Sequence, residues 1–451
     1  MHFFMRAVVC KLLIGTFVAF SCFVQANNSG QPLSQARSIS ETIQIALSNH
    51  PKVSSQQATV SLEAARLGLV ESEFLPHVSL GLGIGREDSN NTSTRVLTGA
   101  GSDEMERREA SVAVSQMLFD GFKTHWQRKS QLDEMSAADW DLKHVSNEVA
   151  LKAVESHLEL SKSNKVLNFN LNNLKAHESI AKNIGLRVKS GKDDQAKVSQ
   201  VNARMALSRA NVEVARNNVM QAISDYWREV GVGPGMKLHF QSHLFRLPDS
   251  RVELVDDVMQ SNPLINALVK RKRSLLSTAK AENNVDYPTL HLESGASWNA
   301  NLDGVEGRNS DVYIMLRMRY DIFQGGAGKA AKKQTSLINQ TAVFELDDAK
   351  REVRRDAEQV WHRYQSSASR VSFLHDYVES ALDTLIAYKK QFNIGQRSLI
   401  DLLDAENELL RSELQLVDAK KVLYLSKYQI LNLQGRLIDA LNAAGDDRNN
   451  G

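Results

Sequence analysis

The chain has 451 residues, of which 42% are hydrophobic, 24% are charged and 6% are aromatic, and its formal net charge is only +2. A small net charge made up of both signs favours a solvated mixed surface and gives no reason to expect nucleic acid as a partner. Only 7 prolines occur, and this scarcity predicts long helices rather than an ordinary globular domain.

The N-terminal segment, residues 1–26, is expected to be a cleaved signal peptide. Val24-Gln25-Ala26 places small residues where signal peptidase reads them, after an apolar stretch that follows basic residues. A lipoprotein signal ending at Cys22 is the alternative, although Phe20 fits that kind of site poorly. Both cysteines, Cys10 and Cys22, fall inside this segment. The mature chain is therefore expected to lack disulfides, zinc thiolates and cysteine nucleophiles.

Repeated landmarks indicate that the rest of the chain is an internal duplication. Pro51 and Pro76 have the same spacing as Pro263 and Pro288, and Gly191 and Gly395 recur later in the two halves at an offset eight residues shorter than that of the prolines. The predicted boundaries are 27–230 for the first repeat, 231–251 for a linker, 252–440 for the second repeat and 441–451 for a flexible tail.

Each repeat is predicted to hold the same elements in the same order. The lead-in helical segments are expected at 40–74 and 252–285, the strand pairs at 77–119 and 289–323, and the long helical hairpins at 120–230 and 324–440. Two tracts, 122–184 and 329–394, contain neither glycine nor proline. Each tract would form a helix about 95–100 Å long.

The strand pairs are identified by alternation of apolar residues with polar residues or glycine. Residues that share a predicted apolar face are Val78, Leu80, Leu82 and Ile84 in the first repeat and Val312, Ile314, Leu316 and Met318 in the second. This pattern suits a barrel wall with lipid on one side and a polar lumen on the other. A polar loop is expected at residues 86–108. No apolar stretch of the mature chain is long enough to cross a membrane as a helix, so no transmembrane helix is expected.

The second helix of each hairpin carries a heptad seam. Its members include Val201, Val212 and Val219 in the first repeat and Leu402 and Leu409 in the second. Such a seam buries a narrow stripe against a neighbouring helix. A simple antiparallel coiled-coil bundle explains the seam equally well. A periplasmic coiled-coil scaffold or adaptor is therefore the alternative function from a different class.

Four strands per chain are too few to close a barrel, for which eight is about the minimum. Open sheet edges are not tolerated in lipid. Three copies would supply twelve strands, and their helical hairpins would continue the barrel as a tube. The sequence therefore predicts an α+β, mostly α chain that forms a trimeric 12-stranded β-barrel continued by a long α-helical barrel.

The order of these features resembles the TolC-like outer-membrane efflux family, especially members serving type I secretion. The turns LFDG and IFQGG and the segment GQRSLIDLLDAENEL carry the resemblance, which covers nearly the whole mature chain. It implies a homotrimeric outer-membrane channel that extends into the periplasm, with the linker in an equatorial belt. It also implies three kinds of partner: outer-membrane lipids, a periplasmic adaptor (membrane fusion) protein, and an inner-membrane ABC transporter or, alternatively, an RND pump. The cargo stays open between exported proteins and the small molecules of multidrug efflux.

The resemblance further implies roles for residues at the hairpin tips. The pore entrance and its gate would be formed by Asp401, Asp404, Arg397 and Glu408, and the tips that dock onto the adaptor by Gly191, Gly395, Ser190 and Gln396. The alternative is a solvated helix face in which Arg397 and Asp401 form an i,i+4 pair. Lys197 and Phe392 depart from the family pattern, so the contacts that latch the closed state are expected to differ.

Three aromatic residues near the strand ends, Phe119, Tyr320 and Phe323, are expected to form an aromatic girdle at the lipid boundary. Ordinary packing is the alternative for them. The glycine-rich segment 325–330 lacks the Ser or Thr that a phosphate loop places after its lysine, and the histidines show no metal-ligand spacing. We therefore expect no catalytic site, metal or cofactor, and the energy for export would come from partners.

Overall fold

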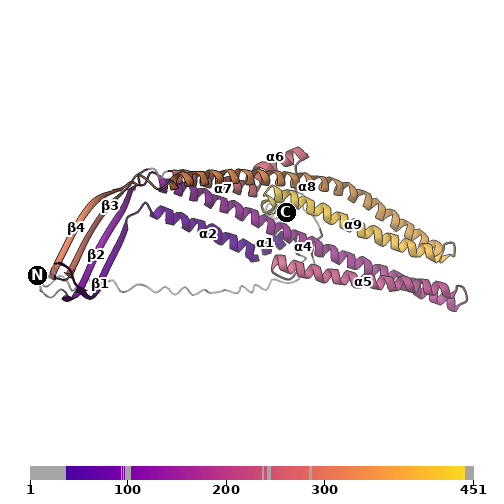
Figure 1. Ribbon diagram of the computed structural model, residues 1–451. Helices are drawn as coiled ribbons and strands as arrows, with labels where there is room; N and C mark the ends of the chain where they lie inside the picture. Colours follow the sequence, from indigo (N-terminus) through magenta and orange to yellow (C-terminus); the bar gives the residue numbers. More distant parts are fainter. Residues whose placement is uncertain are drawn as a thin grey trace, which may run out of the picture. The chain divides into compact units, whose positions relative to one another are not determined.

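The computed structural model describes residues 37–92, 94, 96, 103–235, 238–240, 245–283 and 287–441. The predicted signal peptide, with Cys22, and residues 442–451 of the predicted tail lie outside these ranges. The chain is mostly helical with one four-stranded sheet, so the predicted fold class is confirmed (Figure 1). In chain order the elements are α1 (Ile39–Asn49), α2 (Pro51–Ser72), β1 (His77–Ser89), β2 (Asp103–Phe119), α4 (Lys123–Lys189), α5 (Gln195–Val230), α6 (Arg251–Ser261), α7 (Pro263–Asn283), β3 (Thr289–Leu302), β4 (Val305–Arg319), α8 (Ala327–Asn393) and α9 (Leu399–Leu433).

Each predicted lead-in segment is two helices rather than one. Pro51 is the first residue of α2, and Pro263 is the first residue of α7. Proline has no N–H to continue a preceding helix but fits the first turn of a new one, so both segments break just before it. His50 serves both helices at its break, because its N–H donates to the Ala46 carbonyl at 2.8 Å and its Nδ1 accepts the Lys52 N–H at 3.2 Å.

The four strands form one antiparallel sheet in the order β1-β2-β3-β4. Leu80 pairs with Val112, Val112 with Ala296, and Ala296 with Val312. Directly paired residues point to the same face of a sheet, so the apolar side chains of all four strands lie on one side. Within one chain, 69% of Leu80 and 82% of Val312 are exposed. An exposed apolar face of this kind indicates contact with a protein partner or with lipid.

The opposite face of the sheet is polar. Arg317 on β4 forms an ion pair with Glu293 on β3, with 2.8 Å between Nε and a carboxylate oxygen. The Tyr313 ring lies so close to Gly295 that a β-carbon there would be 2.8 Å from the ring atoms. Glycine is therefore needed at this position, because the cross-strand tyrosine occupies the space of a side chain. The sheet has the two unlike faces that the alternation predicted.

The strand ends differ from the prediction. The predicted polar loop at 86–108 is strand as far as Ser89 and again from residue 103. Its charged residues pair across the two strands, as Arg107 does with Glu87 at 3.0 Å, so this part of the hairpin needs no apolar face. At the other end β4 stops at Arg319, short of the predicted limit at residue 323.

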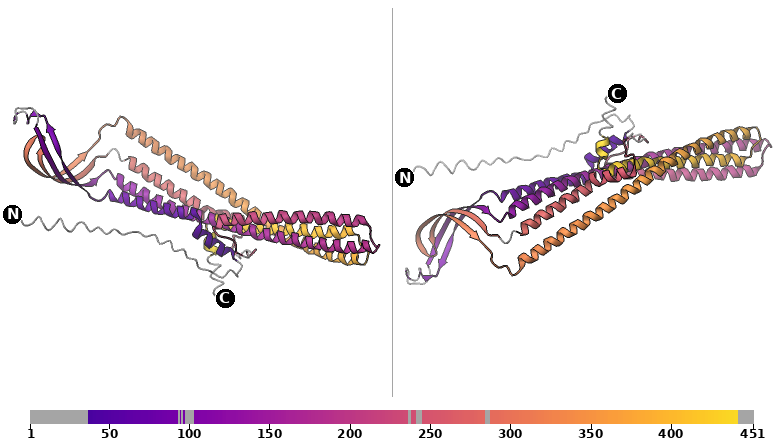
Figure 2. Two further views of the ribbon diagram at one scale, coloured as in Figure 1. Left: turned by 90° about the horizontal axis from the view of Figure 1, so that it is seen from below. Right: turned by 90° about the horizontal axis from the view of Figure 1, so that it is seen from above.

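Two helical hairpins, α4 with α5 and α8 with α9, lie side by side (Figure 2). Helices α4 and α8 each have 67 residues, which corresponds to about 100 Å of helix. The buried seam positions are Val201, Ser208, Val212, Ala215, Val219, Ala222 and Tyr226 on α5 and Leu402, Ala405, Ser412, Ala419, Ser426 and Ile430 on α9. Among the described helices, none combines the length and the apolar character needed to cross a membrane.

One buried cluster joins α1, α4, α5 and α9 with the described residues of the linker. The His239 N–H donates to the Arg37 carbonyl at 3.3 Å. The Phe240 ring packs against Tyr424 of α9, with 5.5 Å between the ring centroids. These contacts fasten the linker to helices from both repeats.

His157 lies within this cluster and is fully buried. Its Nδ1 is 2.8 Å from the Thr42 hydroxyl, and its Nε2 is 3.0 Å from the His239 carbonyl oxygen. Because a carbonyl can only accept, the proton belongs on Nε2, and Nδ1 is left as an unprotonated acceptor beside the Thr42 hydroxyl. Burial lowers the pKa of His157 from its ordinary 6.5 to about 4.

This lowered pKa makes stability depend on pH. The unfolded chain takes up the histidine proton near pH 6.5, whereas the folded chain resists it down to about pH 4. The contribution of neutral His157 is full above pH 6.5 and is lost as the pH falls to 4, at a cost of about 3 kcal/mol. Between pH 7 and pH 4, the free energy of unfolding should fall by about 3 kcal/mol more in the wild type than in a His157→Gln variant. Unfolding of the two detergent-solubilised proteins measures this difference. Parallel pH profiles would contradict the assignment.

Candidate functional site

The first hairpin reverses its direction directly after α4. Gly191 has φ +71°, and its N–H donates to the Val188 carbonyl at 3.0 Å. The next N–H, that of Lys192, reaches the Arg187 carbonyl at 2.9 Å. This pair of hydrogen bonds is a Schellman motif, which satisfies the last carbonyls of a helix and requires a left-handed residue at its centre.

The second hairpin ends α8 with the same motif. Gly395 has φ +80°, its N–H donates to the Phe392 carbonyl at 3.1 Å, and the Gln396 N–H donates to the Gln391 carbonyl at 2.9 Å. Nothing lies within 4 Å of a β-carbon placed on either tip glycine, so backbone conformation alone selects glycine. The two turns contain all four predicted tip residues: Ser190, Gly191, Gly395 and Gln396.

Asp193 is the most enclosed carboxylate at the first tip. Only 4% of its side chain is exposed, and its two oxygens lie 2.5 Å from the Lys197 ammonium and 2.6 Å from the Arg187 guanidinium. The hydrogen bond from Lys197 and the neighbouring Arg187 charge lower the pKa of Asp193. Lys197, where the family pattern suggested an acidic residue, thus works with Asp193 inside the tip.

Arg397 occupies the corresponding place at the second tip. Its Nε donates to Gln391 at 3.0 Å, its guanidinium lies 4.0 Å from the centre of the Tyr388 ring, and it reaches the Asp401 carboxylate at 3.8 Å. Asp401 also forms a capping box with Ser398 at the start of α9. A capping box satisfies free N–H groups of the first helical turn, so Asp401 has a structural task beside any role in a pore.

The tips carry the same ion pair with its charges exchanged. At the offset that relates Gly191 to Gly395, Asp193 corresponds to Arg397, and Lys197 corresponds to Asp401. Both pairs have i,i+4 spacing at the beginning of the second helix. The duplication has kept the position of the pair and reversed its polarity.

Asp404 connects the two hairpins. Its carboxylate lies 3.1 Å from the Arg204 guanidinium of α5, and 58% of its side chain is exposed. Arg204 was not predicted as a site residue, although the duplication contains the signal, because Arg204 corresponds to Glu408 at the same offset between the repeats. The Arg187 guanidinium makes a second connection, 5.3 Å from the centre of the Phe392 ring.

Glu408, the last predicted gate residue, is held on its own hairpin. It accepts a hydrogen bond from the Tyr377 hydroxyl of α8 and lies 3.4 Å from the Arg411 guanidinium. The hydrogen bond to Glu408 raises the pKa of Tyr377. The predicted gate residues therefore have separate contacts: Asp401 caps α9, Asp404 joins the hairpins and Glu408 connects α9 to α8.

The predicted girdle residues lie at or just beyond the strand ends. Phe119 is the last residue of β2 and packs edge-on against Phe122, with 5.5 Å between the ring centroids. Tyr320 and Phe323 follow β4, and 52% and 87% of them are exposed. The exposure of these two rings within one chain is compatible with a lipid boundary.

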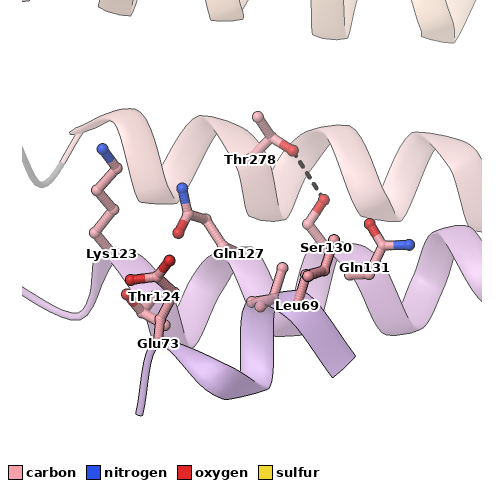
Figure 3. Close-up of a pocket in the computed structure, with 9 residues that line it drawn as sticks. Leu69, Glu73, Lys123, Thr124, Gln127, Ser130, Gln131 and Thr278 are labelled. Atoms are coloured by element: carbon pink, nitrogen blue, oxygen red, sulfur yellow. Dashed lines mark hydrogen bonds between the residues drawn. The ribbon is translucent and has the colours of Figure 1, made fainter. Parts of the chain in front are cut away.

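An open cleft of about 550 Å³ lies between α2, α4 and α7 (Figure 3). Glu73, Lys123 and Gln127 line it, and the Ser130 and Thr278 hydroxyls are hydrogen-bonded at 2.8 Å beside it. These groups do not form an arrangement of nucleophile and base. Among the described residues, no cluster of three or more His, Cys, Asp or Glu side chains is placed to hold a metal ion.

A four-stranded sheet with one apolar face, joined twice to long helical hairpins, is the architecture of outer-membrane channel proteins of the efflux class. A family model described as "Outer membrane efflux protein" matches residues 42–224 and again residues 254–436. The starts of the two matched segments have the same separation as Pro51 and Pro263. The chain belongs to the outer membrane efflux protein family, and it is an outer-membrane protein that extends into the periplasm.

Two curated relatives and one solved structure are similar over nearly their whole lengths. Outer membrane efflux protein BepC of Brucella suis is 24% identical over 433 residues, which are 95% of this chain and 91% of BepC. Alkaline protease secretion protein AprF of Pseudomonas aeruginosa is 23% identical over 423 residues, 88% of this chain and 83% of AprF. The open state of the Neisseria gonorrhoeae MtrE outer membrane channel has the same fold, with a TM-score of 0.75 at 14% identity over 89% of each chain.

The conformation of Gly395 can be tested by comparing a glycine-to-alanine substitution at the tip with one inside a helix. Gly395→Ala forces an alanine to adopt a left-handed conformation and should destabilise the tip by about 1 kcal/mol. Gly185→Ala, inside α4 with open space around its β-carbon, should stabilise its helix by about 1 kcal/mol. Hydrogen exchange of the tip amides should therefore become faster in Gly395→Ala and not in Gly185→Ala. Unchanged exchange in Gly395→Ala would show that the turn does not need this conformation.

Proposed function

We propose that three copies of the chain form the exit duct of a tripartite export system. The observation that carries the proposal is the register of the sheet, which places an exposed apolar face beside two open edges, β1 and β4. Lipid accepts such a face but tolerates no unpaired edge. Pairing β1 of one copy with β4 of the next removes every edge, and three copies give twelve strands, enough to surround a lumen.

In this assembly the helical hairpins continue the barrel as a periplasmic α-helical tube, and their tips form its entrance. Asp401 and Asp404, with Arg397 and Glu408 beside them, line the mouth. Threefold repetition gives two rings of carboxylates, which favour cations at a constriction. Opening requires the two hairpins of each copy to separate. The pair between Arg204 and Asp404 and the stacking of Arg187 on Phe392 oppose that separation.

The same tips dock onto the partners that supply energy. The turns that join the two helices of each hairpin contain Ser190, Gly191, Gly395 and Gln396. A periplasmic adaptor (membrane fusion) protein can reach these turns. No nucleotide-binding or catalytic motif occurs in the sequence, so the channel is passive and not an enzyme. The adaptor joins it to an inner-membrane ABC transporter, or alternatively to an RND pump.

The cargo we favour is protein exported by type I secretion. Similarity to AprF, named as an alkaline protease secretion protein, supports this choice. Similarity to BepC, named as an efflux protein, supports small-molecule efflux as the second candidate. A periplasmic coiled-coil scaffold has no use for a sheet whose apolar face is exposed, so the sheet weighs against that alternative.

Phe119, Tyr320 and Phe323 are proposed to mark the periplasmic boundary of the lipid. They lie where the strands pass into the helices, and aromatic rings are enriched at membrane–water interfaces.

The carboxylate rings determine the selectivity of the mouth. Replacing Asp401 and Asp404 by alanine should lower the cation-to-anion permeability ratio severalfold in planar bilayers, because six negative charges leave a narrow passage. The control replaces Asp347 and Asp348 in the first third of α8, which removes the same charge far from the tips and should leave the ratio close to wild type. Unchanged selectivity in the Asp401 and Asp404 variant would place these residues outside the mouth.

A further inference from the structure

The helix ends next to the sheet carry lysines that have no acidic partner among the described residues. Five of them are exposed, and within the described ranges none has an ion pair. We call this group the basic collar: Lys123 and Lys129 of α4, Lys280 of α7, and Lys329 and Lys333 of α8. The nearby cation Arg128 is different, because its guanidinium lies 2.7 Å from the Glu71 carboxylate.

The collar has a fixed place relative to the sheet. Helix α4 begins at Lys123, shortly after β2 ends at Phe119, and α8 begins at Ala327, shortly after β4 ends at Arg319. Helix α7 ends at Asn283, just before β3 begins. All three helix ends that carry the collar are therefore tied by short connections to the same end of the sheet. Because the helices extend into the periplasm, this end lies at the periplasmic leaflet of the outer membrane.

Trp126 holds two collar lysines on its ring. The Lys280 ammonium is 4.2 Å from the ring centre and the Lys129 ammonium is 5.2 Å from it. Both distances allow attraction between a cation and an aromatic face. An aromatic ring beside lysines whose ammonium groups reach toward water is the combination found where proteins cross the membrane interface.

The collar also has a recess. Lys123 lines the open cleft between α2, α4 and α7 together with Gln127 and Glu73 (Figure 3). The Gln127 amide can donate a hydrogen bond to a phosphate oxygen, whereas the Glu73 carboxylate disfavours an anion inside the cleft. The Thr124 hydroxyl is not available, because it already donates to Asp120 at 2.6 Å. The cleft therefore adds one neutral donor beside Lys123, and the attraction for phosphate comes from the lysines of the collar.

We infer that the basic collar binds the headgroup phosphates of anionic phospholipids in the periplasmic leaflet. Two observations favour this occupant: the collar adjoins the end of a sheet whose apolar face is exposed, and its charge is opposite to that of the phosphates. Lysines near an anionic membrane surface each contribute about a fivefold gain in binding. The collar would thus fix the depth of the barrel in the membrane. The inference rests on the proposed barrel.

The test compares lipids retained by the full-length protein in nanodiscs of phosphatidylcholine with one part in about four of phosphatidylglycerol. After extraction into detergent, native mass spectrometry counts both lipids on the wild type, on Lys129→Gln with Lys280→Gln, and on Lys389→Gln with Lys390→Gln as a charge-matched control near the tips. We expect the wild type to be enriched in phosphatidylglycerol over the bulk mixture. In the collar variant this enrichment should be lower by a factor of at least about five, and in the control variant it should equal that of the wild type.

Replacing the same two lysines by arginine should keep the enrichment, which separates charge from misfolding. Wild type without enrichment, or a collar variant that retains all of it, would overturn the inference. So would a variant that loses co-sedimentation with purified peptidoglycan while its lipid enrichment is unchanged, because the collar would then bind an anionic cell-wall polymer. Failure to insert into any nanodisc would instead count against the barrel itself.

Discussion

A backbone N–H or C=O group at membrane depth has no water to bond to, and this constraint governs the rest of the structure. The sheet satisfies its three internal ladders and leaves one side of β1 and one side of β4 without a neighbouring strand among the described residues. The same strands expose an apolar face that water disfavours. In the proposed trimer, strand pairing between copies resolves the first problem and lipid resolves the second. On the polar face of the sheet, Gly81 of β1 and Gly295 of β3 have no side chain, which leaves room for the cross-strand neighbours Ser111 and Tyr313.

The duplicated hairpins share a backbone and differ in chemistry. Both reverse through the same glycine-centred turn, yet the first tip encloses the Asp193 carboxylate between two cations. At the second tip Arg397 lies against a tyrosine ring and one half-exposed carboxylate, that of Asp401. In the proposed trimer the first and second tips alternate around the ring. The pair of Asp193 with Lys197 and the pair of Arg397 with Asp401 have opposite polarity, so neighbouring tips would place opposite charges next to one another. Exposed ion pairs, such as that between Arg204 and Asp404, are individually weak. That weakness suits a closure which a docking partner has to reverse.

Periodicity in the sequence predicted most of the fold. Alternation at Val78, Leu80 and Leu82 identified β1, because a strand with one apolar face has a period of two. The heptad seam identified α5 and α9, because apolar residues spaced by three and four lie on one side of a helix. The extension of β1 past Arg86 was missed, since charged residues paired across strands leave no alternation to detect. The split of each lead-in segment was also missed, although Pro51 and Pro263 were recognised as landmarks.

The site was predicted less completely, because its contacts join residues that are far apart in sequence. Arg397, Asp401, Asp404 and Glu408 were identified through the resemblance to the efflux family. The pairing of Asp404 with Arg204, which belongs to the other repeat, depends on how two hairpins pack. The burial of Asp193 depends on the tip turn that brings Arg187 back to it. Neither is encoded in a local pattern.

Since several copies must pool their strands to close the proposed barrel, the most direct measurement is the number of chains in one conducting particle. Native mass spectrometry of the detergent-solubilised protein, taken from the preparation that conducts in planar bilayers, should find three chains. A single chain that stays dispersed in water without detergent would contradict the account.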